Sequence, residues 1–183
     1  VCSSDLNGTN NRLSYFGKFG GIFYLPSYDS PILFLCSPND PDTIAACLAS
    51  SELTVTVDWP PGRADFAKKT NLGYRLTDTD WVFCGAIDLT FQPHWLEHAV
   101  TAGDRAQAGV VGTQDLGNPT VKRGQGSTHP LVRRTYIEAQ GGTFDNTGDI
   151  YSETYDHQFV DVELVWVAKQ RGQWAFAKNS IVE

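Results

Sequence analysis

The chain has 183 residues, of which 41% are hydrophobic and 12% aromatic, enough apolar material for the core of one domain rather than two. Its formal net charge of -7 provides no basic stripe for a phosphate backbone, which argues against a nucleic-acid polymer as partner. No apolar run reaches the roughly 20 residues that cross a bilayer, so we expect no transmembrane segment.

The first six residues look foreign to the rest of the chain. Back-translated, residues 1–6 read as the end of a common sequencing adapter, so we interpret them as an assembly artefact and residues 7–183 as a single-domain fragment. The four cysteines show no metal-ligand spacing and are interpreted as free thiols. Free thiols fit a reducing compartment, which predicts the cytoplasm of a bacterium or bacterial host.

Strand and helix signals alternate from the first apolar run onward. Residues 32–36 predict a buried strand that ends in a turn, and residues 43–49 suit a short helix. Residues 53–57 alternate as a strand does, residues 64–76 have a helical pattern, and residues 81–84 form the next strand. This alternation predicts an α/β fold with a mostly parallel sheet flanked by helices.

The middle of the chain continues the pattern and then interrupts it. Pro93 suits the first turn of a further helix, and Gly103 is a plausible stop for it. Residues 109–112 read as a strand. Residues 113–128 are rich in Gly, Asn, Gln and Ser, which predicts a long surface loop that could serve as a mobile lid.

Two carboxylates stand on the first turn of the last predicted helix. Residues 160–168 place their apolar side chains on one face, with Asp161 and Glu163 displaced from it. Gly172 ends this helix before a strand at residues 174–177. A carboxylate here is either a general base or an acid that the helix dipole favours, and the sequence leaves both interpretations open.

Three further carboxylates fall at the ends of predicted strands, namely Asp40, Asp58 and Asp88. Ligands of parallel α/β sheets gather at the carboxyl ends of the strands, so this convergence predicts a binding site there. Each residue has a structural alternative, because Asp40 lies in a turn sequence and Asp88 could cap a helix or close a turn.

In this order, the segments resemble the family 2 glycosyltransferases of the GT-A fold, especially uncharacterised members from phage and bacterial genomes. The likeness covers roughly residues 32–183 and implies a Rossmann-like nucleotide-diphospho-sugar transferase that is truncated at its N-terminal strand. The matching segments are a DxD-type frame at 86–88 with Pro93 and Trp95-Leu96, a nucleotide-side helix at 62–73, an acceptor-side segment at 132–145, and a Glu-Asp motif at 160–161.

The resemblance implies inverting transfer of a sugar from a nucleotide-diphosphate donor to a hydroxyl of a glycan or other acceptor. Asp161 would be the general base, with Glu163 as a second catalytic candidate. Asp88 would hold Mg²⁺ or Mn²⁺ against the diphosphate.

Other residues would bind the two substrates. The predicted nucleotide contacts are Asp40, Asp58, Arg63, Lys69 and Asn71. The predicted acceptor-side residues are His129, Arg133 and His157. The basic residues on the helix at 64–76 have an alternative as a solvated helix face.

Two departures from the family pattern keep other functions open. Ala86 and Ile87 occupy the first two positions of the DxD frame, and Val160 occupies the Glu position of Glu-Asp. The alternatives are a non-catalytic module that binds a nucleotide sugar or glycan on the same scaffold, and a nucleotidyltransferase, because a shared fold does not settle function.

Overall fold

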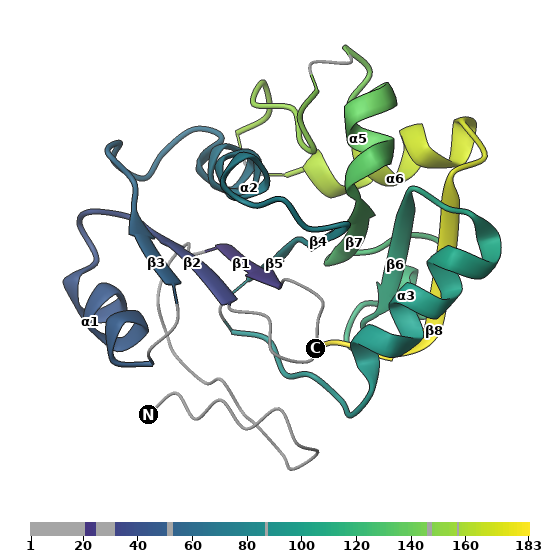
Figure 1. Ribbon diagram of the computed structural model, residues 1–183, viewed down its shortest axis with the longest axis horizontal. Helices are drawn as coiled ribbons and strands as arrows, with labels where there is room; N and C mark the ends of the chain where they lie inside the picture. Colours follow the sequence, from purple (N-terminus) through teal and green to yellow (C-terminus); the bar gives the residue numbers. More distant parts are fainter. Residues whose placement is uncertain (1–20, 25–31, 51–52, 87, 146–147, 157) are drawn as a thin grey trace.

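Two four-stranded sheets lie side by side, with helices above and below them (Figure 1). The computed structural model describes residues 21–24, 32–50, 53–86, 88–145, 148–156 and 158–183. The predicted artefact at residues 1–6 and the predicted acceptor-side residue His157 lie outside these ranges. None of the helices in the described residues has the length and apolar character needed to cross a membrane.

The first sheet has the strand order β3-β2-β1-β5 and the second has the order β4-β7-β6-β8. The strands of the first are β1 (Gly21–Tyr24), β2 (Ile32–Cys36), β3 (Leu53–Thr56) and β5 (Gly85–Ala86). Those of the second are β4 (Trp81–Phe83), β6 (Val110–Gln114), β7 (Pro130–Arg133) and β8 (Trp174–Ile181). The α/β class is confirmed.

The prediction of a mostly parallel sheet is wrong. Only the pairs β2 with β3 and β6 with β8 are parallel, whereas the pairs formed by β1 with β2 and β5, and by β7 with β4 and β6, are antiparallel. Parallel neighbours need a crossover connection, usually a helix. Between β6 and β7 the chain has only a four-residue helix, α4 (Pro119–Lys122).

The described residues also contain the helices α1 (Pro41–Ala49), α2 (Asp65–Leu76), α3 (Trp95–Ala106), α5 (Arg134–Gln140) and α6 (Val160–Gln170). The expected helices near 43–49, 64–76 and 160–168 are therefore confirmed within two residues. The segment at 113–128, predicted as one long loop, contains the end of β6 and all of α4. α4 begins there because the Asn118 side chain accepts hydrogen bonds from the Thr120 and Val121 N–H groups.

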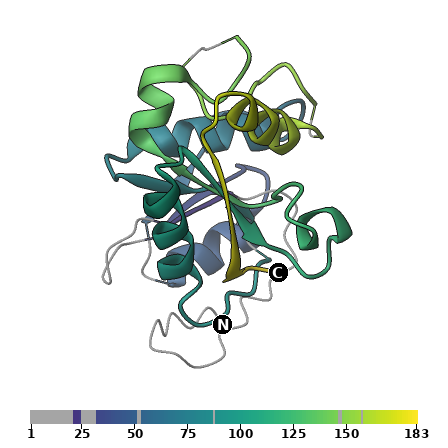
Figure 2. The same ribbon diagram turned by 90° about the vertical axis from the view of Figure 1, so that its right-hand side faces the viewer.

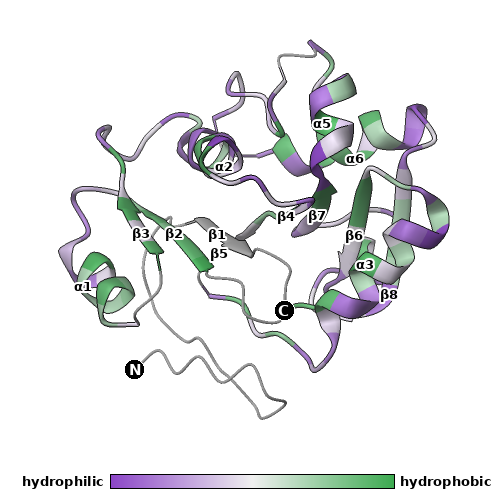
Figure 3. Ribbon diagram, in the orientation of Figure 1, coloured by the Kyte–Doolittle hydropathy of each residue, from purple (hydrophilic) through white to green (hydrophobic). Residues whose placement is uncertain are grey.

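Both faces of the central strands are buried, each in its own core. Leu33 of β2 and Val82 of β4 pack with α2, α5 and α6, while Phe34 and Phe83 pack with α1 and α3 on the other face. Successive side chains of a strand point to opposite faces, so two cores require a continuous apolar run in each strand. Figure 3 shows this run as hydrophobic colour along β2 and β7, while α2 and α5 mix hydrophobic and hydrophilic residues.

α3 continues through Gly103, where the sequence predicts a stop, and ends at Ala106. Gly103 is buried, and a Cβ atom at this position would overlap the Trp81 ring and lie 2.8 Å from Val111 Cγ2. Close packing of the helix on β4 and β6 therefore requires glycine inside α3 rather than after it.

A buried ion pair joins α2 to the end of β2. Lys69 Nζ lies 2.7 Å from Asp65 Oδ2 and 2.6 Å from the Ser37 hydroxyl, and both charged side chains are almost fully buried. Asp65 Oδ1 also accepts a hydrogen bond of 2.9 Å from Trp59 Nε1. Lys69 is therefore enclosed in the fold and does not lie on a solvated helix face.

We expect Gly103→Ala to lower the free energy of unfolding by about 1–3 kcal/mol, because the added methyl group would force α3 away from the sheet. On an exposed helix the same change stabilises by up to about 1 kcal/mol, so the sign is diagnostic. Urea denaturation measures the difference. Gly62→Ala is the control, since nothing lies within 4 Å of a Cβ atom at Gly62; equal effects of the two changes would contradict the packing argument.

We expect Lys69→Met to destabilise the fold by about 3–5 kcal/mol, because it leaves the Asp65 carboxylate buried without its cation. Thermal and urea unfolding measure the loss. The adjacent Lys68→Met serves as the matched control, because Lys68 is only half-buried. An unfolding midpoint for Lys69→Met that equals that of the control would rule out a structural role for the pair.

Candidate functional site

Side chains from distant segments meet where β4 ends, at Cys84. The Cys84 thiol is fully buried and faces the Tyr151 hydroxyl. The Cys84 backbone acts on the pKa of the His129 ring, and the Cys84 N–H donates to the Pro130 carbonyl at 2.9 Å. Burial raises the pKa of the Cys84 thiol to about 12, so this cysteine stays protonated and is a poor nucleophile or metal ligand.

Three carboxylates lie close enough for their charges to act on this group. The charges of Asp115 and Asp88 raise the pKa of His129, and the charge of Asp161 raises the pKa of Tyr151. Asp88 follows β5, Asp115 follows β6, and Asp161 is on the first turn of α6. We define the Cys84 cluster by six residues: Cys84, Asp88, Asp115, His129, Tyr151 and Asp161.

His129 is neutral near pH 7. Burial lowers its pKa below the ordinary value, and the opposing effects of Asp115, the Cys84 backbone and Asp88 only partly offset burial. Its Nδ1 atom is buried and has no hydrogen-bond partner among the described residues. A neutral imidazole with an unpaired nitrogen can accept or donate one hydrogen bond to a ligand, depending on its tautomer.

Tyr151 connects α2 to the first turn of α6. The Asn71 side chain donates to the Tyr151 carbonyl at 2.9 Å and accepts from the Tyr151 N–H at 3.0 Å. Burial raises the pKa of Tyr151 well above its ordinary value, and the neighbouring Cys84 and Asp161 raise it further. Asn71, predicted as a nucleotide contact, therefore positions Tyr151 through both of its amide atoms.

α6 begins in an unusual backbone conformation. Phe159, directly before the helix, has a φ of 75° in the left-handed region, which bulky side chains seldom adopt. Backbone strain of this kind is concentrated at functional sites. The half-buried Asp161 follows two residues later.

Glu163 is directed toward the loop that precedes α6. It is 7% exposed, and its Oε1 atom accepts a hydrogen bond of 3.0 Å from the Phe144 N–H. Its Oε2 atom is buried without a partner among the described residues. A buried carboxylate oxygen without a partner is costly, so this atom is available to a ligand or water.

An aromatic surface lies beside these two carboxylates. The Phe144 and Trp166 rings are in contact, with their centroids 4.9 Å apart and their planes tilted by 47°, and both are about half exposed. Phe159 and Val162 are exposed as well, at 59% and 56%. Positions 159, 162 and 166 are spaced by three and four residues, which places them on one face of the helix end.

The remaining predicted nucleotide residues lie at the ends of β2 and β3 and before α2. Asp40 caps α1, since its Oδ1 atom accepts from the Thr43 N–H at 3.1 Å and its Oδ2 atom accepts from the Thr43 hydroxyl at 2.8 Å. Asp58 is exposed shortly after β3. Arg63 forms an exposed ion pair of 3.0 Å with Asp156.

The structure separates the two described acceptor-side residues. His129 precedes β7 and lies in the Cys84 cluster, whereas Arg133 is the last residue of β7. The Arg133 guanidinium pairs with Asp104 at 2.6 Å and lies 4.1 Å from the centroid of the Trp81 ring. Arg133 is thus at the opposite end of the strand from His129.

Within the described ranges, no three His, Cys, Asp or Glu side chains gather as a preformed metal site. Asp88, predicted as a metal ligand, is exposed and has a carboxylate that could supply one oxygen ligand. Mg²⁺ is usually bound by one or two carboxylates together with substrate phosphates and waters, so a single carboxylate beside a diphosphate site fits this chemistry.

Sequence reasoning missed Cys84, Tyr151 and Asp115 as members of the site. Asp115 carried a usable signal, because it follows the apolar run of β6 just as Asp88 follows β5. Tyr151 carried none, since its position depends on two hydrogen bonds to Asn71, 80 residues away.

Comparison with known proteins identifies a scaffold rather than a family. No protein-family model matches the chain, and no curated protein matches it. Among solved structures, S. aureus TarS (residues 1–349) matches 82% of this chain with a TM-score of 0.55 and 11% sequence identity. The chain spans 49% of that structure, about half its length. TarS is a glycosyltransferase, and at this sequence identity the match shows that the two chains have a similar fold.

Proposed function

We propose that this chain is a family 2 type glycosyltransferase that transfers a sugar from a nucleotide-diphosphate donor to a hydroxyl acceptor with inversion. The proposal is supported by two observations: the charge of Asp88 acts on His129 and that of Asp161 acts on Tyr151, both beside Cys84, and the fold is similar to that of a glycosyltransferase. These two carboxylates come from segments more than 70 residues apart in the sequence, so a local turn or cap does not account for their convergence.

Asp161 is the proposed general base. The acceptor hydroxyl oxygen would attack the anomeric carbon on the face opposite the diphosphate, and the hydroxyl proton would pass to the Asp161 carboxylate. The bond between the anomeric carbon and the diphosphate oxygen breaks as the new glycosidic bond forms. Glu163, which is held by Phe144 and buried, supports the loop beside the base or accepts a ligand hydrogen bond through Oε2.

Asp88 would hold Mg²⁺ or Mn²⁺ at the diphosphate, where a bound cation offsets developing negative charge. His129 is the proposed neighbouring contact, because it is neutral and its Nδ1 atom is unpaired among the described residues. A neutral ring can approach the acceptor or a phosphate oxygen without repelling the cation held by Asp88.

The exposed Asp58 and Arg63 are the proposed direct contacts to the nucleotide. Asp40 stands at the same end of the sheet but already accepts two hydrogen bonds from Thr43. Lys69 and Asn71 act indirectly, since their side chains hold Ser37 and Tyr151.

The aromatic surface of Phe144, Phe159, Val162 and Trp166 favours a sugar-containing acceptor. The half-exposed rings of Phe144 and Trp166, tilted by 47° to each other, each offer an apolar ring face, which suits the C–H face of a pyranose ring. The surface adjoins Asp161 on α6, so a sugar bound there would present its hydroxyl groups to the proposed base.

We expect Asp161→Asn to lower the turnover rate by about 10²–10⁴-fold while donor binding is retained, because the amide cannot take the acceptor proton. Turnover is measured as release of the nucleoside diphosphate, across a panel of nucleotide sugars and acceptors. The same assay on Glu163→Gln shows whether Asp161 or Glu163 is the general base, because only loss of the base should lower turnover to this extent. Asp145→Asn is the matched control, because Asp145 is an exposed carboxylate near the same loop.

We expect Asp88→Asn to weaken the activation of turnover by Mn²⁺ and Mg²⁺ at least about tenfold, since it removes the charged metal ligand. A titration of either cation at fixed donor concentration measures this. Asp42→Asn, an exposed change on the first turn of α1, is the control. Donor binding without turnover in the unaltered protein would contradict the transferase proposal and favour a non-catalytic nucleotide-sugar-binding module, which Ala86 and Val160 already make the second candidate.

A further inference from the structure

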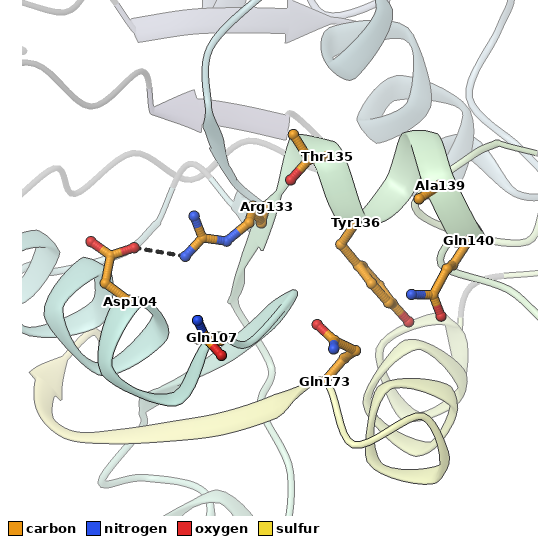
Figure 4. A pocket seen from close by; sticks show the side chains of 8 residues that line it. All are labelled: Asp104, Gln107, Arg133, Thr135, Tyr136, Ala139, Gln140 and Gln173. Atoms are coloured by element: carbon orange, nitrogen blue, oxygen red, sulfur yellow. Dashed lines mark hydrogen bonds and ion pairs between the residues drawn. The ribbon is translucent and has the colours of Figure 1, made fainter.

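A cavity of about 420 Å³ lies at the other end of the second sheet from the Cys84 cluster. Its walls come from the end of α3, from α5 and from the turn before β8 (Figure 4). β6 and β8 both start here, as the pairing of Val110 with Trp174 shows, whereas Asp115 follows the far end of β6. The cavity is therefore separated from Asp115 by the length of β6.

Arg133 is held rigidly at one side of this cavity. Its Nη2 atom pairs with Asp104 at 2.6 Å, its Nε atom donates to the Ala108 carbonyl at 3.2 Å, and its guanidinium stacks on Trp81. Its Nη1 atom has no hydrogen-bond partner among the described residues. Because three contacts already fix the side chain, a hydrogen bond from Nη1 to a ligand would cost little conformational entropy.

Three glutamines stand around the same cavity, at positions 107, 140 and 173 (Figure 4). Within the described part of the chain, none of their side-chain amides forms a hydrogen bond to the protein. Each amide offers both donors and an acceptor, as a hydroxyl group does. Asp104 neutralises the charge of Arg133. The lining therefore has no net positive charge that would attract an anion.

Tyr136 also lines the cavity, and its ring is fixed and almost fully buried. Tyr136 is 4% exposed and packs so closely on Gly109 that a Cβ atom there would overlap the ring. Its hydroxyl accepts a hydrogen bond of 3.1 Å from Arg171 Nη1. The cavity therefore combines unpaired amides with a preorganised guanidinium, and its volume is near the lower end of the range for small-molecule sites, about 300–1,000 Å³.

We propose that this cavity is a binding site for an uncharged saccharide, separate from the proposed transfer site. The hydroxyl groups of a sugar can both donate hydrogen bonds to the glutamine amides and accept hydrogen bonds from them. A hydroxyl oxygen can also accept a hydrogen bond from Arg133 Nη1. A phosphorylated ligand would instead bring its charge close to the Asp104 carboxylate. The proposal goes beyond the transferase function, because binding here requires neither donor, metal nor turnover.

The test is binding of maltose, lactose and N,N′-diacetylchitobiose to the whole chain without any donor, followed by NMR of the labelled protein. We expect at least one of these sugars to bind with a millimolar dissociation constant and to shift the side-chain amide signals of Gln140 and Gln173. Replacing both glutamines, as Gln140→Ala with Gln173→Ala, should weaken binding about tenfold or more, because two hydrogen-bonding groups are lost.

The matched control replaces two exposed glutamines outside the cavity, as Gln92→Ala with Gln170→Ala, and should leave binding unchanged. The Asp161→Asn protein should also bind the sugar normally. Sugar binding at the cavity is therefore expected even if the transferase proposal is wrong. The proposal is overturned if none of the sugars binds at millimolar concentration, if the cavity variant binds as tightly as the control, or if the shifts fall only on residues of the Cys84 cluster.

Discussion

Burial of both faces of the central strands is the constraint on which the rest of this structure depends. Leu33 and Phe34 are neighbours in β2, yet they enter different cores, and Val82 and Phe83 do the same in β4. Strands enclosed in this way leave little room for charge along their length, because a buried charge without a partner is costly. Polar groups therefore collect where strands begin and end, and both proposed sites lie at such positions.

At one end of the second sheet, the Cys84 cluster contains three uncharged side chains and three carboxylates. The thiol of Cys84 and the hydroxyl of Tyr151 are buried and stay protonated, and His129 is neutral. The carboxylates are those of Asp88, Asp115 and Asp161. Asp88 follows β5, Asp115 follows β6, and Asp161 is in α6. Asn71 ties the arrangement to α2 by fixing the Tyr151 backbone, so a residue predicted to touch the nucleotide instead positions part of the site.

At the other end, the cavity beside Arg133 has the opposite electrostatic character. Its cation is paired with Asp104, and its remaining polar groups are neutral amides. The first end suits a metal-bound diphosphate and a proton transfer, while the second suits an uncharged, hydroxyl-rich ligand.

The sequence by itself determined several of the secondary-structure elements and the positions of several carboxylates, because these follow from local periodicity and turn chemistry. The run at β2, the pattern of α2 and the acids of α6 were all predictable from neighbouring residues. Only the tertiary structure decided strand direction, the burial of Lys69 against Asp65, and the separation of Arg133 from His129. Gly103 shows the physical reason: locally it reads as a helix stop, but the Trp81 ring packed against it, 22 residues away in sequence, makes it part of the helix interior.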